Sequence, residues 1–386
     1  MSISRRSFLS TASGSIALAM FSLPCGGSRL IAQTRKDPRA AWNAPDATTS
    51  SDPRLQALAY AILAPNPHNR QPWLIDLKGD AELIVSCELE RRLPATDPLD
   101  RQITIGFGAF LELLRMAASK LGYEALITEF PQGEPGNRLD ERPIANVIFR
   151  KNPLIKADPL FQHVLARRTN RGPFDMTRAV DEGVLASVRS ASLAPGQVFS
   201  SSEPKLTAKL RDLVWAAFKM EAMTHDPHME SVNLMRLGRA EVTANPDGIS
   251  LDAPELEALV VQGILTRGAM ASPDTPVFKQ FLAVTEAPVR ATPAFVWLVT
   301  PDNRRVSQLA AGRDWVRLNL MATSMGLGLH PQSATLQEYP EMYQLLDEVH
   351  DLLDARKGRI QMLGRIGYAP RAVPSPRWPL ETRLRT

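Results

Sequence analysis

The sequence predicts an α+β protein built from two fused, degenerate halves. Three observations indicate this: apolar residues recur at helical spacing in several stretches, short strand-like runs alternate with them, and parts of the first half recur in the second. The predicted first half covers residues 52–155, and the second covers residues 156–386 with an insertion at about 215–287. With 386 residues, the chain is long enough for two ordinary domains or one elaborated domain with a sizeable core.

Residues 1–34 are predicted to be an export signal. Arg5 and Arg6 stand in the run Ser-Arg-Arg-Ser-Phe-Leu, and a modestly apolar stretch follows. This pattern is typical of a twin-arginine signal, which implies the twin-arginine translocase as a transient partner and a periplasmic location. A lipoprotein site at Cys25 is the alternative, although the residues before it match poorly. Residues 35–51, rich in Pro, Ala and Thr, are predicted to be a linker.

The composition narrows the function classes. The formal net charge of +4 comes from scattered arginines without a basic block interleaved with aromatic residues, which argues against a nucleic-acid partner. The sequence has two cysteines, Cys25 and Cys87, and Cys25 leaves with the signal, so we expect no internal disulfide. Alternation around Cys87 indicates a buried strand residue and not a nucleophile.

The internal repeat has two parts with different offsets. Residues 55–65, with helical apolar spacing, align without gaps on residues 185–195. Further along, one constant offset relates Gly108, Leu114, Ala118 and Gly122 to Gly312, Leu318, Ala322 and Gly326. Each of these later stretches is a predicted helix that ends at a glycine suited to a left-handed cap. The second offset exceeds the first, so the insertion lies in the second half; chance similarity between two amphipathic helices is the alternative.

Four runs are predicted to be strands, at residues 73–77, 83–89, 295–300 and 361–366. The first of them follows a polar loop, residues 64–73, with the sequence Ala-Pro-Asn-Pro-His-Asn-Arg-Gln-Pro-Trp. Its three prolines forbid both a helix and a regular ladder, so the loop holds its amides and its histidine in a stiff cluster. Such a cluster suits a planar ligand with many donors and acceptors. A polar surface turn without a ligand is the alternative.

Two further segments carry arginines. Residues 167–173 read Arg-Arg-Thr-Asn-Arg-Gly-Pro, and the forked guanidinium donors in this run can bind a phosphate bidentately. A solvated surface turn is the alternative. Near the end of the chain, a predicted strand ends in Gly-Tyr and leads into a proline-rich arm, residues 374–379, that carries Arg377.

The polar loop, the arginine-rich segment and the arm together resemble the flavin-binding segments of the nitroreductase superfamily, and the fused halves resemble its Acg-like branch from mycobacteria. This resemblance implies a pseudo-dimer with mixed central sheets flanked by helices and with one bound FMN. The second half lacks the polar loop after residue 195, so one complete flavin site is expected to remain and the other to be lost. The insertion would serve as a lid.

The resemblance also assigns residues to the cofactor. The expected contacts to the ring are Pro67, His68, Asn69 and Gln71. The expected contacts to the phosphate and ribityl chain are Arg167, Arg168, Thr169, Arg171 and Arg377, with Arg365 as a weaker alternative to Arg377. Gln332 and Ser333 are further candidates at the ring, or else form a simple turn after a helix.

The resemblance implies an FMN-dependent oxidoreductase that reduces nitroaromatics, quinones or similar small acceptors by two electrons, with NAD(P)H or another electron donor. No protein side chain is assigned as a catalytic acid or base. The alternative is a protein that holds FMN without turnover. His225 and His228 have metal-like spacing but no third ligand nearby, so we interpret them as structural or surface residues and expect no metal site.

Overall fold

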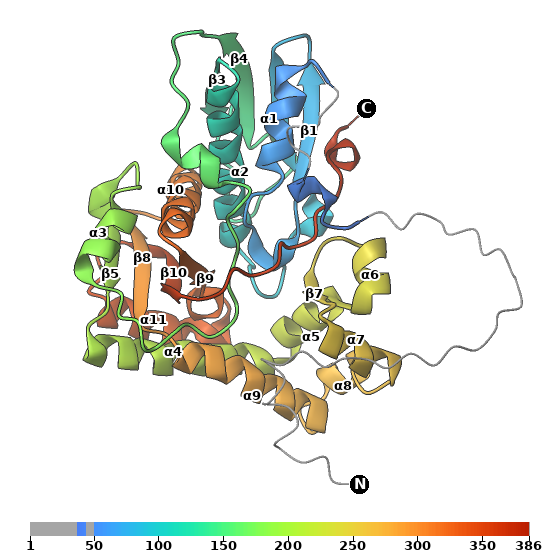
Figure 1. Ribbon diagram of the computed structural model, residues 1–386, viewed down its shortest axis with the longest axis vertical. Helices are drawn as coiled ribbons and strands as arrows, with labels where there is room; N and C mark the ends of the chain where they lie inside the picture. The colour runs from blue at the N-terminus through green and yellow to red at the C-terminus, as the bar shows by residue number, and fades with distance from the viewer. Residues whose placement is uncertain (1–36, 44–49, 386) are drawn as a thin grey trace, which may run out of the picture. The chain divides into compact units, whose positions relative to one another are not determined.

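The computed structural model describes residues 37–43 and 50–385, drawn in colour in Figure 1. The predicted export signal lies outside the described residues, as do residues 35–36 and 44–49 of the predicted linker. Within the described ranges, no helix combines the length and the apolar character that crossing a membrane requires.

The first half consists of one four-stranded sheet and two helices. In chain order its elements are α1 (Pro53–Ala61), β1 (Trp73–Lys78), β2 (Glu82–Cys87), α2 (Arg101–Lys120), β3 (Tyr123–Glu129) and β4 (Ala145–Lys151), and the strand order in the sheet is β1-β2-β4-β3. Asp52 caps α1 by accepting a hydrogen bond from the backbone of Arg54. In the core, Trp73 stacks on Phe110 with ring centroids 5.0 Å apart. Cys87 is buried, and burial raises its thiol pKa to about 12, which confirms it as a core residue.

The second half repeats this topology. Its corresponding elements are α3 (Glu182–Arg189), β5 (Val198–Ser201), β8 (Ala294–Thr300), α10 (Arg305–Ser324), β9 (Leu327–Pro331) and β10 (Arg359–Tyr368), with α11 (Tyr343–Leu352) before the last strand. The strand order is β5-β8-β10-β9, so each strand has a counterpart at the same place in the first sheet. The α+β architecture is confirmed, and the two sheets agree with duplicated halves.

The four predicted strands are confirmed to within two residues at each end, but the expectation of mixed sheets is wrong. All strand pairs within the two four-stranded sheets are antiparallel. The physical reason is the same in both halves. Strands β2 and β3, which α2 connects, run in the same direction, but they are not neighbours. Strand β4 lies between them and pairs antiparallel with each. An isolated parallel β-bridge pairs Ile75 with Leu384 at the edge of the first sheet.

The two halves meet where α2 crosses α10. At the crossing, a Cβ atom on Gly108 would lie 2.0 Å from the carbonyl oxygen of Leu309, and one on Gly312 would lie 1.9 Å from that of Ile105. The two glycines are equivalent in the predicted repeat, so the crossing has a pseudo-twofold character. Both helices are followed by a glycine with left-handed φ, 79° and 73°, as the repeat predicts.

The segment between β5 and β8, which we call the insertion, covers residues 204–290. Its elements are α4 (Pro204–Met223), α5 (His225–Leu234), β6 (Met235–Leu237), α6 (Gly238–Ala244), β7 (Ile249–Leu251), α7 (Pro254–Val261), α8 (Arg267–Ala271) and α9 (Pro276–Arg290). Strands β6 and β7 form a parallel pair. A small core of its own includes Met235 and Met270, which agrees with methionine acting as packing here.

The C-terminal arm returns from the second half to the first (Figure 1). The backbone N–H of Arg377 donates to the carbonyl of Pro38, and that of Trp378 donates to the side chain of Gln71. Further along, the N–H of Arg385 donates to the carbonyl of Ile75 in β1. The last residues of the chain therefore complete the surroundings of the polar loop.

Candidate functional site

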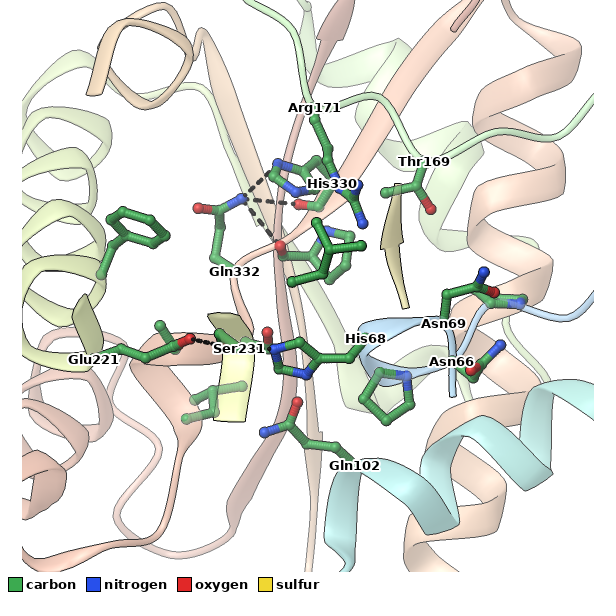
Figure 2. A pocket seen from close by; sticks show the side chains of 18 of the residues that line it. Asn66, His68, Asn69, Gln102, Thr169, Arg171, Glu221, Ser231, His330 and Gln332 are labelled. Carbon is green, nitrogen blue, oxygen red and sulfur yellow. Dashed lines mark hydrogen bonds between the residues drawn. The ribbon is translucent and has the colours of Figure 1, made fainter. Parts of the chain in front are cut away.

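A cavity of about 440 Å³ is lined by residues from both halves and from the insertion. It brings together the polar loop, the N-terminal part of α2, the arginine-rich segment and the residues that follow β9 (Figure 2). Nine of the residues expected to contact the cofactor line it: Pro67, His68, Asn69, Arg167, Thr169, Arg171, Gln332, Ser333 and Arg377. Gln71 and Arg168 are not among the lining residues.

The polar loop is held in an unusual backbone conformation. A 3₁₀ turn, Pro67–Asn69, follows α1, and His68, Asn69 and Gln71 all have left-handed φ, between 47° and 51°. Such φ values are costly for residues with a Cβ atom and cluster at functional sites. The side chain of Asn66 stabilises the turn, because its Oδ1 accepts from the N–H of Gln71 at 2.8 Å. The prolines and this bond together point His68 into the cavity.

The amides of Asn69 and Gln71 anchor the loop from behind. Asn69 Nδ2 donates to the carbonyl of Pro376 at 3.0 Å, and its Oδ1 accepts from Arg377. Gln71 is fully buried, and its Nε2 donates to the carbonyl of Pro246 in the insertion at 2.8 Å. Gln71 therefore ties the loop to the insertion and to the arm, while His68 and Pro67 remain at the cavity.

Two arginines at the cavity have N–H groups without protein partners. Arg167 is 2% exposed, and of its side-chain nitrogens Nη2 donates to the carbonyl of Leu63, whereas Nε and Nη1 are buried without a hydrogen bond among the described residues. Burial, with Arg168 adding, lowers the pKa of Arg167 to about 9. Arg171 keeps exposed surface toward the cavity and makes no hydrogen bond or ion pair within the described part of the chain, and desolvation lowers its pKa. These donors, with the Thr169 hydroxyl beside them, suit an oxyanion.

Arg377 lines the same cavity, but its N–H groups are already hydrogen-bonded to the protein. Its five N–H groups all donate within the protein, to the side chain of Asn69 and to backbone carbonyls. Those carbonyls belong to Ile62, Leu63, Ala64 and Pro376. Because three of them follow α1 directly, Arg377 satisfies the end of that helix and fixes the loop. It therefore supports the site without offering a free donor to a phosphate.

The other two candidate arginines are also held by the protein. Arg168 Nη1 donates to the carbonyls of Leu165 and Arg167, and Arg365 donates to the carbonyls of Pro288, Asn170 and Gly172. Trp42 packs against the basic cluster, with the guanidinium carbons of Arg167, Arg168 and Arg377 at 5.6, 4.5 and 5.3 Å from its ring centroid.

His330 presents a donor on the opposite wall. Its Nδ1 accepts from Arg365 Nε at 3.0 Å and lies 3.0 Å from the amide nitrogen of Gln332. Since an arginine N–H can only donate, the imidazole is neutral and carries its proton on Nε2. Burial, with Arg365 and Arg171 adding, lowers the pKa of His330 well below its usual value. The Nε2–H group is then available at the cavity.

The insertion forms the remaining wall. Phe218, Phe281 and Val284 contribute apolar surface. Glu221 and Ser231 contribute polar groups (Figure 2). His68 Nε2 lies 3.1 Å from Ser231 Oγ, which in turn donates to Glu221 Oε1 at 3.1 Å. The insertion is thus bonded to the polar loop from the side that faces the cavity.

The insertion is also fastened outside the cavity. Asp247 pairs with Arg236 within the insertion and with Arg91 of the first half, each at 2.7 Å. The carboxylate of Glu230 accepts from the backbone N–H groups of Ala95 and Thr96. His228, one of the two histidines with metal-like spacing, lines the cavity from the insertion. Its Nε2 lies 2.9 Å from the carbonyl of Met270 and its ring packs edge-on against Phe278, which are structural contacts.

The equivalent position in the other half carries a large side chain. Ala109 of α2 lines the cavity, and the repeat offset places Arg313 of α10 at the same position. Arg313 Nη1 pairs with Glu129 at 2.7 Å, at the end of β3, the counterpart of β9. An ion pair thus occupies the position that a small residue takes at the cavity.

Sequence reasoning does not identify Gln102, Glu221, Ser231 or His330, which line the cavity, or Trp42, which packs against the arginines. Trp42 falls in the predicted linker, and Glu221 and Ser231 are single polar residues on helices of the insertion, where they resemble solvent-facing residues. The sequence indicates a loop that begins at His330. The hydrogen bond from Arg365 that fixes the tautomer of His330 joins residues 35 positions apart, so the sequence pattern does not show it.

The fold and the site define an α+β protein with a basic, partly apolar cavity between duplicated halves. No protein-family model matches the chain. An uncharacterised protein of Mycobacterium tuberculosis is 28% identical over 343 residues, which cover 85% of this chain and 91% of that protein. A protein of the same species named "Putative NAD(P)H nitroreductase acg" is 26% identical over 352 residues, which cover 84% and 92%.

Among solved structures, the FMN-dependent nitroreductase NfnB from Mycobacterium smegmatis, in complex with NADPH, matches with a TM-score of 0.36 and 18% identity, over 59% of this chain and 97% of that chain. The chain is therefore a distant relative, along most of its length, of mycobacterial proteins that carry a nitroreductase name.

Proposed function

We propose that this chain binds one FMN in the cavity and acts as an oxidoreductase of the nitroreductase type, which reduces small acceptors such as nitroaromatics and quinones by two electrons. The observation that carries the proposal is the pair of arginines with unused donors, Arg167 and Arg171. Arg167 is buried with two unused donors, which is costly, whereas Arg171 offers exposed donors at the cavity. A phosphate would accept charge-assisted hydrogen bonds from both, worth roughly 1.5–3 kcal/mol each. The distant relation to the acg protein supports the same function.

The lining residues offer donors that could serve both ends of FMN. Arg167, Thr169 and Arg171 would hold the phosphate and the ribityl chain. Pro67 and His68 on one wall, and His330 with Gln332 and Ser333 on the other, would hold the ring. When bound, FMN would supply the exchange of a hydride between donor and acceptor.

The protein residues provide placement and a suitable environment. The Nε2–H group of His330 offers a hydrogen bond to negative charge that develops on a ring, and Arg171 adds positive charge nearby. The apolar side chains of the insertion exclude water from the same space.

The proposal extends to the electron donor and the location. NAD(P)H is the donor that the name of the acg protein suggests, and another reductant takes its place if the protein is exported. The arginine pair near the N-terminus supports export by the twin-arginine route to the periplasm. That route carries folded proteins, so FMN would be bound before export.

A second candidate function is the retention of FMN without turnover. The bonds between the insertion and the polar loop favour it, because Gln71 and His68 both contact insertion residues beside the cavity. In that case the insertion would keep the flavin in place and keep acceptors out.

An absorption spectrum of the purified protein, with mass identification of what heat releases, tests the binding of FMN. A colourless protein would contradict both candidate functions. Yellow protein is then treated anaerobically with NADPH and, separately, with dithionite. Bleaching by both, with reoxidation by a quinone, supports the oxidoreductase; bleaching by dithionite alone supports retention or a different donor.

A further inference from the structure

We propose that Glu221, Ser231 and His68 form a proton relay into the cavity, in which His68 gives the proton to the bound acceptor. This inference rests on the proposed function, because it concerns the proton that a two-electron reduction consumes. His68 is then a catalytic residue, and Ser231 and Glu221 are positioning residues that act through it.

The geometry joins three elements of the fold at hydrogen-bond distance. His68 comes from the polar loop, Ser231 from α5 and Glu221 from α4, and all three line the cavity. The distances are 3.1 Å from His68 Nε2 to Ser231 Oγ and 3.1 Å from Ser231 Oγ to Glu221 Oε1. Figure 2 shows the three side chains in this order. The proton source, Glu221, therefore belongs to the insertion, and the group that delivers the proton, His68, belongs to the first half.

The three groups have two fully hydrogen-bonded states. With Glu221 ionised, Ser231 donates to the carboxylate and His68 donates its Nε2–H to Ser231. With Glu221 protonated, the carboxyl donates to Ser231, Ser231 donates to Nε2, and His68 carries its proton on Nδ1. The heavy atoms occupy the same places in both states, so protons alone move between them.

The reduction of a quinone shows how the relay would be used. The quinone gains a hydride from the reduced cofactor, which is oxidised, and its negative oxygen takes the proton from His68 Nδ1. As that N–H bond breaks, Nε2 takes the proton of Ser231, and Ser231 takes the proton of Glu221. One proton has then left Glu221, and its negative charge replaces the charge on the acceptor.

The surroundings keep His68 neutral. Burial lowers its pKa to about 4, and the positive charges of Arg171 and Arg70 act in the same direction. At neutral pH the imidazole holds one proton, which either nitrogen can carry. A neutral histidine is what the exchange between the two states requires.

The surroundings also favour a proton on Glu221. Burial raises the pKa of this carboxyl and the negative charge of Glu230 adds to the effect, while the hydrogen bonds from Gln337 and Ser231 oppose it. Gln337 Nε2 donates to Glu221 Oε2 at 2.8 Å, so both carboxyl oxygens have partners.

Tyr339 lies close enough to Glu221 to feel its charge. The pKa of the Tyr339 hydroxyl is raised by burial and by the charge of Glu221. Tyr339 also lines a surface cleft together with Glu230.

The test uses the full-length, flavin-loaded protein and compares E221Q, S231A and S231T with the control E348Q, an exposed residue on α11. Protein reduced with dithionite is mixed anaerobically with 1,4-benzoquinone or with ferricyanide from mildly acidic to mildly alkaline pH. Ferricyanide accepts electrons alone, so it reports electron transfer without proton delivery. Nitrogen-15 NMR of the His68 ring in the resting protein provides a second readout.

We expect E221Q and S231A to slow reoxidation by benzoquinone by about 100-fold or more and to flatten its pH profile, with ferricyanide unaffected. S231T, which keeps the hydroxyl, restores the rate, and E348Q behaves as the wild type. In the wild type, His68 changes from the Nδ1–H to the Nε2–H tautomer as the pH rises through the titration of Glu221, whereas in E221Q it keeps one tautomer.

Unchanged benzoquinone rates in both variants, or equal slowing with ferricyanide, would overturn the relay and leave FMN binding intact. A wild-type His68 that carries its proton on Nε2 at every pH tested would also overturn it. A wild-type protein that holds no flavin overturns the proposed function and the relay together.

Discussion

Arg171 and Arg377 line the same cavity but stand in opposite chemical states. Arg377 gives all of its N–H groups to protein oxygens, whereas Arg171 gives none to the described residues. The sequence cannot separate these roles, because Arg377 is held by backbone carbonyl groups, and every residue has such a group whatever its side chain. The structure therefore shifts the expected phosphate contacts toward Arg167 and Arg171.

Replacing Arg171 by alanine should weaken FMN binding. The loss of hydrogen bonds from a charged group costs roughly 1.5–3 kcal/mol, which corresponds to a rise in Kd of roughly 10- to 150-fold. Fluorescence titration of flavin-free protein with FMN measures it. R150A, at an exposed arginine paired with Glu124, is the control and should bind as the wild type. Equal affinity of R171A and R150A would refute the assignment of Arg171.

Replacing Asn69 by alanine should act through the arm. The variant removes one partner of Arg377 and one partner of the Pro376 carbonyl, which should lower the free energy of unfolding by about 1–3 kcal/mol and reduce flavin occupancy. Urea unfolding and the ratio of flavin to protein absorbance measure the two effects. Asn137 is exposed, and N137A should change neither. Full occupancy in N69A would show that the loop keeps its shape without this anchor.

At the level of elements, the contact between α2 and α10 depends on two glycines. The G108A variant places a methyl group where the carbonyl of Leu309 lies, so the helices must separate. Overpacking of this kind should lower the free energy of unfolding by about 1–3 kcal/mol. A shift of the urea midpoint measures it.

The matched control is G268A, because a Cβ atom at Gly268 meets nothing within 4 Å. That variant should be neutral or slightly stabilising, since alanine is a better helix former than glycine. If G108A were as stable as G268A, helices α2 and α10 would accommodate the methyl group without any loss in the free energy of unfolding, which would contradict this prediction.

Strands and helices with a regular pattern could be predicted, since Trp73 and Ile75 alternate inward and the repeated glycines end their helices. The pairing of strands could not, because it depends on β4 and β10 entering between strands that a helix connects. The site could be predicted only in part, because some of its contacts join residues that are far apart in the sequence. The prolines of the polar loop are visible in the sequence, whereas the contact of Ser231 with His68 joins residues 163 positions apart.

At the level of the whole molecule, buried histidines should make stability depend on pH. Burial lowers the pKa of His68 to about 4 and also lowers the pKa values of His228, His330 and His350. Below a pH of about 6.5, the unfolded chain takes up protons on these residues and the folded chain does not, so stability is fully present above that pH and falls as the pH drops.

The expected loss is on the order of 1 kcal/mol for His68 at about pH 5.5 relative to about pH 8, with further losses from the other three. Urea unfolding at the two pH values measures it. H228Q should reduce the dependence because glutamine does not titrate. Buried carboxyls with raised pKa values, Asp97 and Glu221, act in the opposite direction, so the comparison with H228Q isolates one histidine. A pH dependence of H228Q equal to that of the wild type would contradict the neutral state of His228.

The arm that carries Arg377 has a consequence for biosynthesis. The walls of the cavity come from residues near both ends of the described chain, since Arg377 packs on Trp42 and on the turn after α1. Residues 374–379 are synthesised after the other walls of the cavity, so the cavity is complete only once this segment has left the ribosome. A chain cut short before residue 374 would lack this wall.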